Sequence, residues 1–165
     1  MNKIVKILTV FTLIAALFAG CTLPDVTHEH ADLTITLPGN FADQTDTELG
    51  EGFEFLYVSS DIGLCGLKET KSELEQLVGE LDAKSYAELL IELNELDCTV
   101  SVREGVPGFK YSDTIDGEAY TYLAVTYEVN GNLWLLQAYC KTDKFVELET
   151  QMYTYLTSVS FTQAD

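Results

Sequence analysis

The chain has 165 residues, and its 27 acidic residues against nine basic ones give a formal net charge of −18 at pH 7. A surface this acidic repels phosphate backbones and anionic lipid headgroups, which argues against a nucleic-acid partner and against direct adhesion to a membrane. The length suits one domain with its own hydrophobic core and is short for two.

The first 20 residues have the features of a secretory signal. Lys3 and Lys6 supply a basic start, and residues 7–20 carry no charge. That run is too short to span a bilayer as a helix, which takes about 20 apolar residues. It ends in the small residues Ala19 and Gly20, as a processing site does. We therefore expect residues 1–20 to be a signal peptide that is removed.

The segment LFAGC, residues 17–21, resembles the bacterial lipoprotein box, although Phe18 stands where that family prefers Leu. The resemblance implies a diacylglyceryl group on the sulfur of Cys21, cleavage before it, and a palmitate-type lipid anchor on the extracytoplasmic side of a membrane. Two or more acyl chains hold a protein stably, whereas one does so only marginally. The alternative is an ordinary secretory signal with a chance cysteine. The sequence does not distinguish an outer leaflet from a periplasmic location.

Residues 21–31 lack apolar periodicity, so we expect a tether between the acylated Cys21 and a single domain over residues 32–165. Ten extended residues reach at most roughly 35 Å. Both histidines, His28 and His30, fall in this tether. A His-x-His pair in an unstructured segment is a weak metal site, so we expect neither a metal nor a cofactor.

The domain begins with alternating apolar residues over 32–38, which predict a half-buried strand, followed by a turn at PGN. Two further strands are expected in FEFLYVSS and IGLCGLKE. Between them and the first strand lies an acidic loop with Asp43, Asp46, Glu48 and Glu51. This loop lacks the ligand spacing and the glycine of an EF-hand, which favours a solvated loop over a weak Ca²⁺ site.

The stretch from 70 to 97 predicts two helices separated at Gly79. Ser72 with Glu75 and Ser85 with Glu88 have the three-residue spacing of capping boxes. A last helix is expected over residues 143–159, capped by Thr142 or Asp143, before a short closing strand in VSF.

From Thr99 the pattern has a period of two, with strands in TVSVR, GFKYSDTI, EAYTYLAVTYEV and NLWLLQAYC. Asp116-Gly117 and Asn130-Gly131 predict tight hairpins. With Asn130-Gly131 as a two-residue loop, Trp134 and Leu135 lie on opposite faces of one strand, and both faces are apolar. An antiparallel sheet open to water would alternate cleanly, so we expect this sheet to be central and covered on both sides.

The predicted fold class is α+β, with an antiparallel sheet of about six strands covered by helices on both faces. The order of elements and the phrases LPGNF, SYAELL and SVSF resemble the PsbP-like fold, whose members include an extrinsic photosystem subunit, a nuclear-transport factor and small bacterial lipoproteins. The resemblance implies an α/β/α sandwich that acts as a binding or accessory subunit, and it carries no catalytic residue.

Aromatic residues crowd the predicted hairpins. The candidate binding surface lies beside an expected loop at 105–109 and consists of Phe109, Tyr111 and Tyr122. The alternative is that these side chains pack in the core.

Three cysteines remain besides Cys21: Cys65, Cys98 and Cys140. At most two of them can form a disulfide, and there are three possible pairs. Buried free thiols are favoured over a disulfide.

The sequence offers no nucleophile and histidine pair inside the domain, and no phosphate-binding loop. We therefore expect a lipid-anchored extracytoplasmic binding or accessory protein without catalytic activity, whose protein or small-molecule partner the sequence does not identify. The alternative is a small hydrolase that uses a carboxylate pair or a bound cation at the cell surface.

Overall fold

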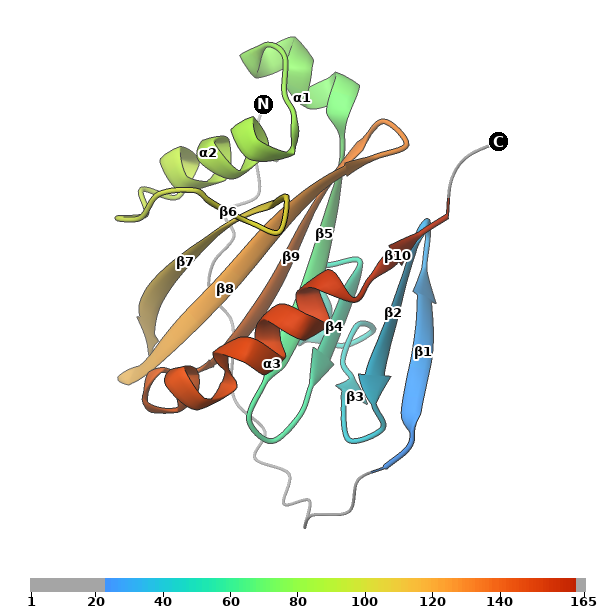
Figure 1. Cartoon of the computed structure of the whole chain (residues 1–165), viewed down its shortest axis with the longest axis vertical. Helices are drawn as coiled ribbons and strands as arrows, with labels where there is room; N and C mark the ends of the chain where they lie inside the picture. The colour runs from blue at the N-terminus through green and yellow to red at the C-terminus, as the bar shows by residue number, and fades with distance from the viewer. Residues whose placement is uncertain (1–22, 163–165) are drawn as a thin grey trace.

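The computed structural model describes residues 23–162. That range forms three α-helices and ten strands in two antiparallel sheets, which confirms the α+β class (Figure 1). The larger sheet has seven strands in the order β3-β4-β5-β9-β8-β7-β6, and the smaller has three in the order β1-β2-β10. The strands are β1 (Asp25–His30), β2 (Leu33–Pro38), β3 (Ala42–Asp43), β4 (Phe55–Val58), β5 (Gly63–Thr70), β6 (Ser101–Arg103), β7 (Val106–Ile115), β8 (Glu118–Val129), β9 (Asn132–Lys141) and β10 (Ser160–Phe161); the helices are α1 (Lys71–Val78), α2 (Ala83–Leu93) and α3 (Phe145–Thr157).

The predicted register of the β8–β9 hairpin is confirmed. Val129 faces Asn132 across the turn, and Asn130 and Gly131 both have positive φ angles, 51° and 74°. A type I′ turn requires positive φ at both central positions, which glycine and asparagine adopt most easily. Asp116 and Gly117 make the same kind of turn between β7 and β8.

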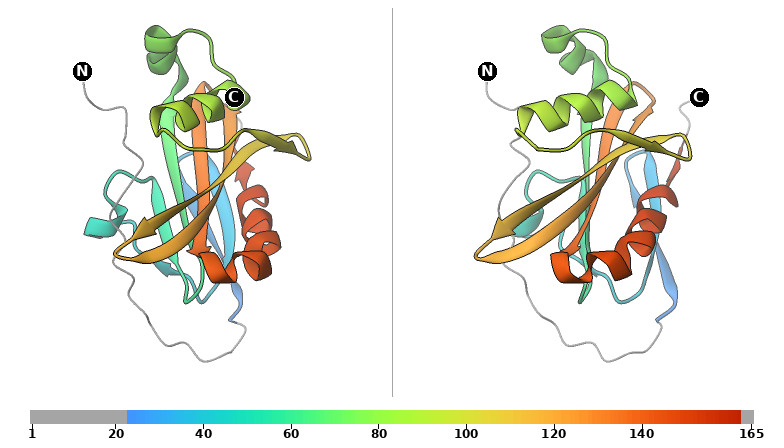
Figure 2. Two further views of the ribbon diagram at one scale, coloured as in Figure 1. Left: turned by 90° about the vertical axis from the view of Figure 1, so that its left-hand side faces the viewer. Right: turned by 60° about the vertical axis from the view of Figure 1, so that its left-hand side comes forward.

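The central strand β9 is covered on both faces, as expected. The side chains of Trp134 and Leu135 point to opposite faces, and both are fully buried. Trp134 packs on the side of α3, in a cluster with Met152 and Leu156, whereas Leu135 packs on the side of α2. Figure 2 shows α2 and α3 on either side of the seven-stranded sheet.

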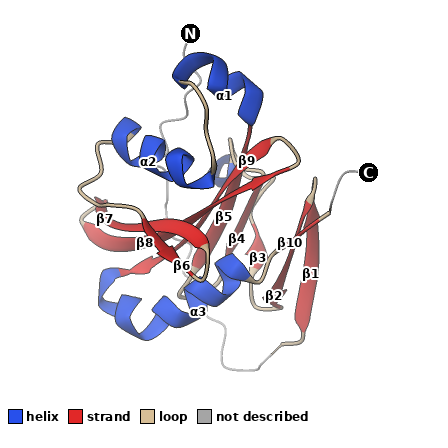
Figure 3. Ribbon diagram, turned by 45° about the horizontal axis from the view of Figure 1, so that its top comes forward, coloured by secondary structure: helices blue, strands red, loops and turns tan. Residues whose placement is uncertain are grey.

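The smaller sheet lies on the same side as α3 (Figures 1 and 3). The residues Leu33, Ile35 and Leu37 of β2 are buried in the α3-side cluster, and β10 pairs with β2 directly after α3. The prediction of a single sheet of about six strands is corrected here to one sheet of seven strands and a separate one of three.

The predicted tether is wrong over residues 25–30, because β1 pairs with β2 along its whole length, from Asp25 opposite Pro38 to His30 opposite Leu33. As an edge strand with mostly exposed side chains, β1 is held by main-chain hydrogen bonds and has no apolar alternation to detect.

The predicted break at Gly79 is confirmed, since α1 ends before that residue and Gly79 has a φ of +90°. The predicted caps are wrong. Asp82 caps α2, because its carboxylate accepts from the main-chain N–H of Ser85 at 2.7 Å while the Ser85 hydroxyl accepts from the N–H of Asp82. The side chain of Thr70 does not cap α1, and α3 follows a 3₁₀ turn over Thr142–Lys144 without a side-chain cap.

The expected loop at 105–109 is instead a further tight hairpin, whose second strand begins at Val106. Glu104 and Gly105, with φ of 54° and 84°, turn the chain between β6 and β7, and Arg103 faces Val106. This hairpin forms the edge of the large sheet beside α3 (Figure 1).

Candidate ligand pocket

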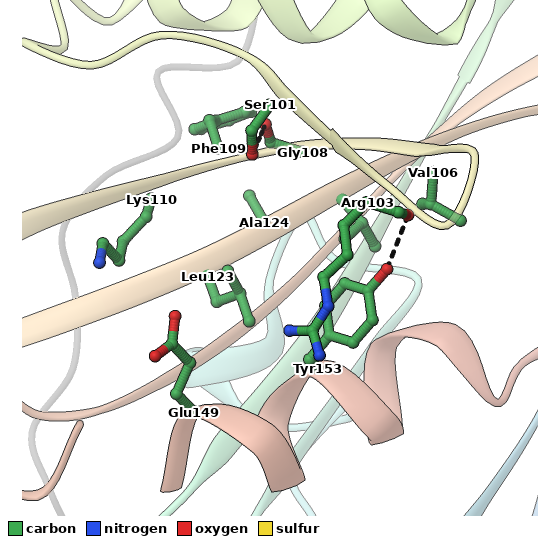
Figure 4. Close-up of a pocket in the computed structure, with 11 residues that line it drawn as sticks. Ser101, Arg103, Val106, Gly108, Phe109, Lys110, Leu123, Ala124, Glu149 and Tyr153 are labelled. Atoms are coloured by element: carbon green, nitrogen blue, oxygen red, sulfur yellow. Dashed lines mark hydrogen bonds between the residues drawn. The ribbon is translucent and has the colours of Figure 1, made fainter. Parts of the chain in front are cut away.

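A pocket of about 190 Å³ lies between the β6–β7 hairpin, β8 and α3, and it is partly open to solvent (Figure 4). Its walls combine apolar and charged side chains from segments that are up to 52 residues apart in sequence. The lining residues are Ser101, Arg103, Val106, Gly108, Phe109, Lys110, Leu123, Ala124, Val125, Glu149 and Tyr153.

The alternation along β7 determines what reaches this pocket. Lys110 and Leu123, which face each other across β7 and β8, lie on the α3 side of the sheet, where Lys110 contacts Phe145. Gly108 lets the two strands approach closely: a Cβ atom built on it would lie 2.4 Å from the main-chain oxygen of Ala124. A larger residue at position 108 would therefore push the hairpin away from β8.

Arg103 and Tyr153 form one wall of the pocket. The guanidinium carbon of Arg103 lies 3.9 Å from the centre of the Tyr153 ring, and the Tyr153 hydroxyl donates a 2.8 Å hydrogen bond to the main-chain oxygen of Arg103. An arginine held over an aromatic ring by a cation–π contact keeps its charge and its N–H donors available for a ligand.

Lys110 and Glu149 complete the charged part of the lining. The ammonium of Lys110 lies 5.1 Å from the centre of the Phe145 ring, at the start of α3. Glu149, one turn further along α3, is half-buried and is the only carboxylate in the lining. Figure 4 shows Arg103 and Lys110 on either side of Leu123, with Glu149 beneath it. The pocket offers charged and apolar groups to a ligand, but its lining holds no pair of carboxylates for acid–base chemistry.

The residues predicted as a binding surface, Phe109, Tyr111 and Tyr122, are 3%, 8% and 5% exposed, so that surface prediction is wrong. All three belong to the cluster on the α2 side of the sheet, where the rings of Tyr111 and Tyr122 stack 4.7 Å apart. Burial raises the pKa of both tyrosines. Phe109 also contributes to the wall of the pocket.

The two histidines contact β4, which lies next to the edge strand β3 in the large sheet. His30 Nε2 and the Tyr57 hydroxyl are 2.7 Å apart, and the rings of His28 and Tyr57 have centres 4.4 Å apart. Burial lowers the pKa of His30. Among residues 23–162, no three His, Cys, Asp or Glu side chains gather in a way that could hold a metal ion.

The cysteines Cys65, Cys98 and Cys140 are free thiols in the described structure, which agrees with the favoured prediction. Burial raises the pKa of Cys65 to about 12 and that of Cys140 to about 11. Neither thiol is poised as a nucleophile, because the thiolate is the reactive form. Cys21 and the predicted signal peptide lie outside the described residues.

Sequence reasoning missed this pocket. Arg103 could have been noticed as the only arginine of the chain, but its placement depends on the Glu104-Gly105 turn, which carries a weaker signal than Asn-Gly or Asp-Gly. Tyr153 and Glu149 give no signal beyond the periodicity of α3.

Three solved structures share this fold at low sequence identity. Cyanobacterial PsbP (CyanoP) from Synechocystis matches with a TM-score of 0.52 and 11% identity, over 91% of this chain and 99% of that one. LpqN of Mycobacterium tuberculosis, described as involved in cell envelope biogenesis, matches with a TM-score of 0.50 and 15% identity, over 84% and 91%. A protein from Bacteroides thetaiotaomicron matches with a TM-score of 0.53 and 11% identity. The match covers 87% of this chain but only 50% of that protein.

The fold is therefore PsbP-like, as the sequence resemblance implied. No protein-family model matches the chain, and no curated protein was found to be similar in sequence. None of the helices in the described range is long and apolar enough to cross a membrane.

Proposed function

We propose that this protein is a lipid-anchored binding or accessory domain of the bacterial cell envelope, held on the extracytoplasmic side through Cys21, and that the pocket beside Arg103 is its ligand site. The observation that carries the binding role is the pocket itself, where two cations and several apolar side chains converge between the β6–β7 hairpin and α3. The anchor rests on the LFAGC segment.

The similar proteins support an accessory role by analogy of fold, since one of them is a PsbP protein and another is involved in cell envelope biogenesis. Fold alone does not determine function, so the analogy supports the proposal without replacing the argument from the site. A carboxylate-pair hydrolase has less support, because Glu149 is the only acidic residue in the lining of the pocket.

The position of β1 limits how far the domain can lie from its proposed lipid anchor. The first strand begins at Asp25, only four residues after Cys21. Four extended residues reach at most roughly 14 Å, less than half the reach expected for the predicted tether. The domain would therefore stay close to the membrane, while its negative charge repels anionic headgroups.

The anchor is tested with a Cys21→Ala variant, with Cys98→Ala as the matched control because Cys98 is a partly exposed thiol within the domain. Membrane fractionation and metabolic labelling with a palmitate analogue are the measurements. We expect Cys21→Ala to lose the label and leave the membrane fraction, and Cys98→Ala to keep both. A Cys21→Ala protein that stays membrane-bound would overturn the anchor.

A further inference from the structure

The cations of the pocket differ from most others in the chain. Of the seven basic residues between 23 and 162, Lys68, Lys71, Lys84 and Lys141 each form an ion pair with a carboxylate. Arg103, Lys110 and Lys144 have no such pair within that range, although acidic residues outnumber basic ones three to one in the whole chain. Two of these three cations line the same pocket.

Aromatic rings hold these two cations in place. Arg103 lies on Tyr153 and Lys110 lies over Phe145, and both side chains remain exposed. A cation–π contact orients a cation without neutralising its charge. Each cation thus remains available to an anion that enters from solvent.

The rest of the lining suits an apolar group. Val106, Leu123 and Val125 offer aliphatic side chains to the lining, and Figure 4 shows Leu123 between Lys110 and Arg103. An engineered apolar cavity of about 150 Å³ is known to hold benzene. The pocket, at about 190 Å³, has room for a body of about six to eight carbon atoms by that comparison.

From these observations we infer that the pocket binds a small organic monocarboxylate, with its carboxylate between Arg103 and Lys110 and its apolar body against Leu123 and Val125. Arginine matches the planar geometry of a carboxylate through two parallel N–H donors. Glu149 limits the ligand to a single negative charge, because two cations and one carboxylate leave one net positive charge in the lining. A dianion such as a phosphate monoester would face repulsion from Glu149.

This inference rests on the proposed binding role of the pocket and names its ligand class. It is tested with the membrane-anchored protein reconstituted in nanodiscs of neutral lipid, with empty nanodiscs as the blank. The probes are benzoate and hexanoate, each compared with its neutral amide, benzamide or hexanamide. Dissociation constants are measured by NMR titration. We expect each carboxylate to bind at least tenfold more tightly than its amide, because the charged hydrogen bonds are lost in the amide.

Variants place the binding in this pocket. Arg103→Gln and Lys110→Gln should each weaken benzoate binding about tenfold, and Glu149→Gln should strengthen it. Lys84→Gln is the matched control, because it removes an exposed cation on α2 that pairs with Glu88 and does not line the pocket. Thermal unfolding of each variant checks that the fold is retained.

Three outcomes would overturn the inference: equal binding of acid and amide, an effect of Lys84→Gln as large as that of Arg103→Gln, or weaker binding in Glu149→Gln. The failure of the anchor is a separate result, since a Cys21→Ala protein that remains on the membrane would leave the carboxylate titration unaffected. Conversely, if Cys21→Ala leaves the membrane fraction but the pocket does not distinguish acid from amide, the proposal of a lipid anchor stands. The proposal of a carboxylate ligand is then wrong.

Discussion

The hydroxyl of Tyr153 on α3 donates to the main-chain oxygen of Arg103 on β6, while the Arg103 side chain lies over the same ring. Two contacts thus join the exposed edge hairpin to the helix that closes the pocket. The strand β6 is short, all three of its residues are exposed, and within its sheet it pairs only with β7. The ring of Tyr153 therefore supports the wall that carries Arg103.

Removing the hydroxyl in Tyr153→Phe should lower the free energy of unfolding by about 1 kcal/mol, the usual net value of one hydrogen bond. The ring under Arg103 is retained in this variant. Tyr153→Leu should cost more, because the cation–π contact and part of the packing are lost as well. Urea denaturation of both variants measures the difference. A neutral Tyr153→Phe would mean that the hydrogen bond does not stabilise the hairpin.

Gly108→Ala tests the close approach of β7 and β8 at the pocket. The new Cβ would meet the oxygen of Ala124 at 2.4 Å, which is main chain and cannot turn aside. We expect a loss of about 1–3 kcal/mol in the free energy of unfolding, as for other overpacked sites. Ser101→Ala, on the facing strand, is the control and should stay within about 0.5 kcal/mol of the parent. Equal stability of the two variants would show that the hairpin can move away without cost.

The two faces of β9 give a test of the layered fold. Trp134→Ala and Leu135→Ala should each lower the free energy of unfolding by about 2–5 kcal/mol, because both side chains are fully buried on opposite faces. Trp134→Phe should cost less than Trp134→Ala, since the described residues offer the buried indole N–H no hydrogen-bond partner to lose. Guanidinium unfolding measures all three. A near-neutral Leu135→Ala would contradict the cover by α2.

The sequence predicted the β8–β9 register and the burial of both faces because an Asn-Gly turn sets the pairing, after which alternation assigns each side chain to a face. It missed β1, since an edge strand held by main-chain bonds needs no apolar pattern. It also offered Phe109, Tyr111 and Tyr122 as an exposed surface, whereas these side chains are buried in the cluster on the α2 side of the sheet. Alternation separates Phe109 from Lys110, but it does not say which face a helix will bury.

The helix caps show the same limit at shorter range. Ser85 and Glu88 match a capping box, yet the residue at the cap is Asp82, three positions earlier. We expect Asp82→Ala to lower the free energy of unfolding by about 1 kcal/mol and Glu88→Gln to change it by less than about 0.5 kcal/mol. Thermal and urea unfolding of the two variants distinguish a cap at Asp82 from a capping box of Ser85 and Glu88. A larger loss of stability in Glu88→Gln than in Asp82→Ala would support the capping box expected from the sequence.

The contact between His30 and Tyr57 gives the domain a pH dependence of known sign. His30 on β1 lies 2.7 Å from the Tyr57 hydroxyl on β4, which ties the smaller sheet to the larger one. Burial, with a smaller contribution from His28, lowers the pKa of His30, and this outweighs the opposing effect of Asp43 and Glu54. The folded protein therefore binds a proton at His30 less tightly than the unfolded chain, whose histidines titrate near pH 6.5.

The neutral form of His30 contributes fully to the stability of the fold at pH values above the pKa of histidine in the unfolded chain. This contribution is lost as the pH falls through the lower pKa that His30 has in the folded protein. We expect the melting temperature to fall between pH 7.5 and pH 5, and to fall less in His30→Gln. The carboxylates titrate in both proteins, so the difference between the two curves isolates His30. Thermal melts at half-unit intervals provide the measurement. Parallel curves for the two proteins would mean that His30 has the same pKa in the folded and unfolded states. The pH dependence of the melting temperature would then not come from His30.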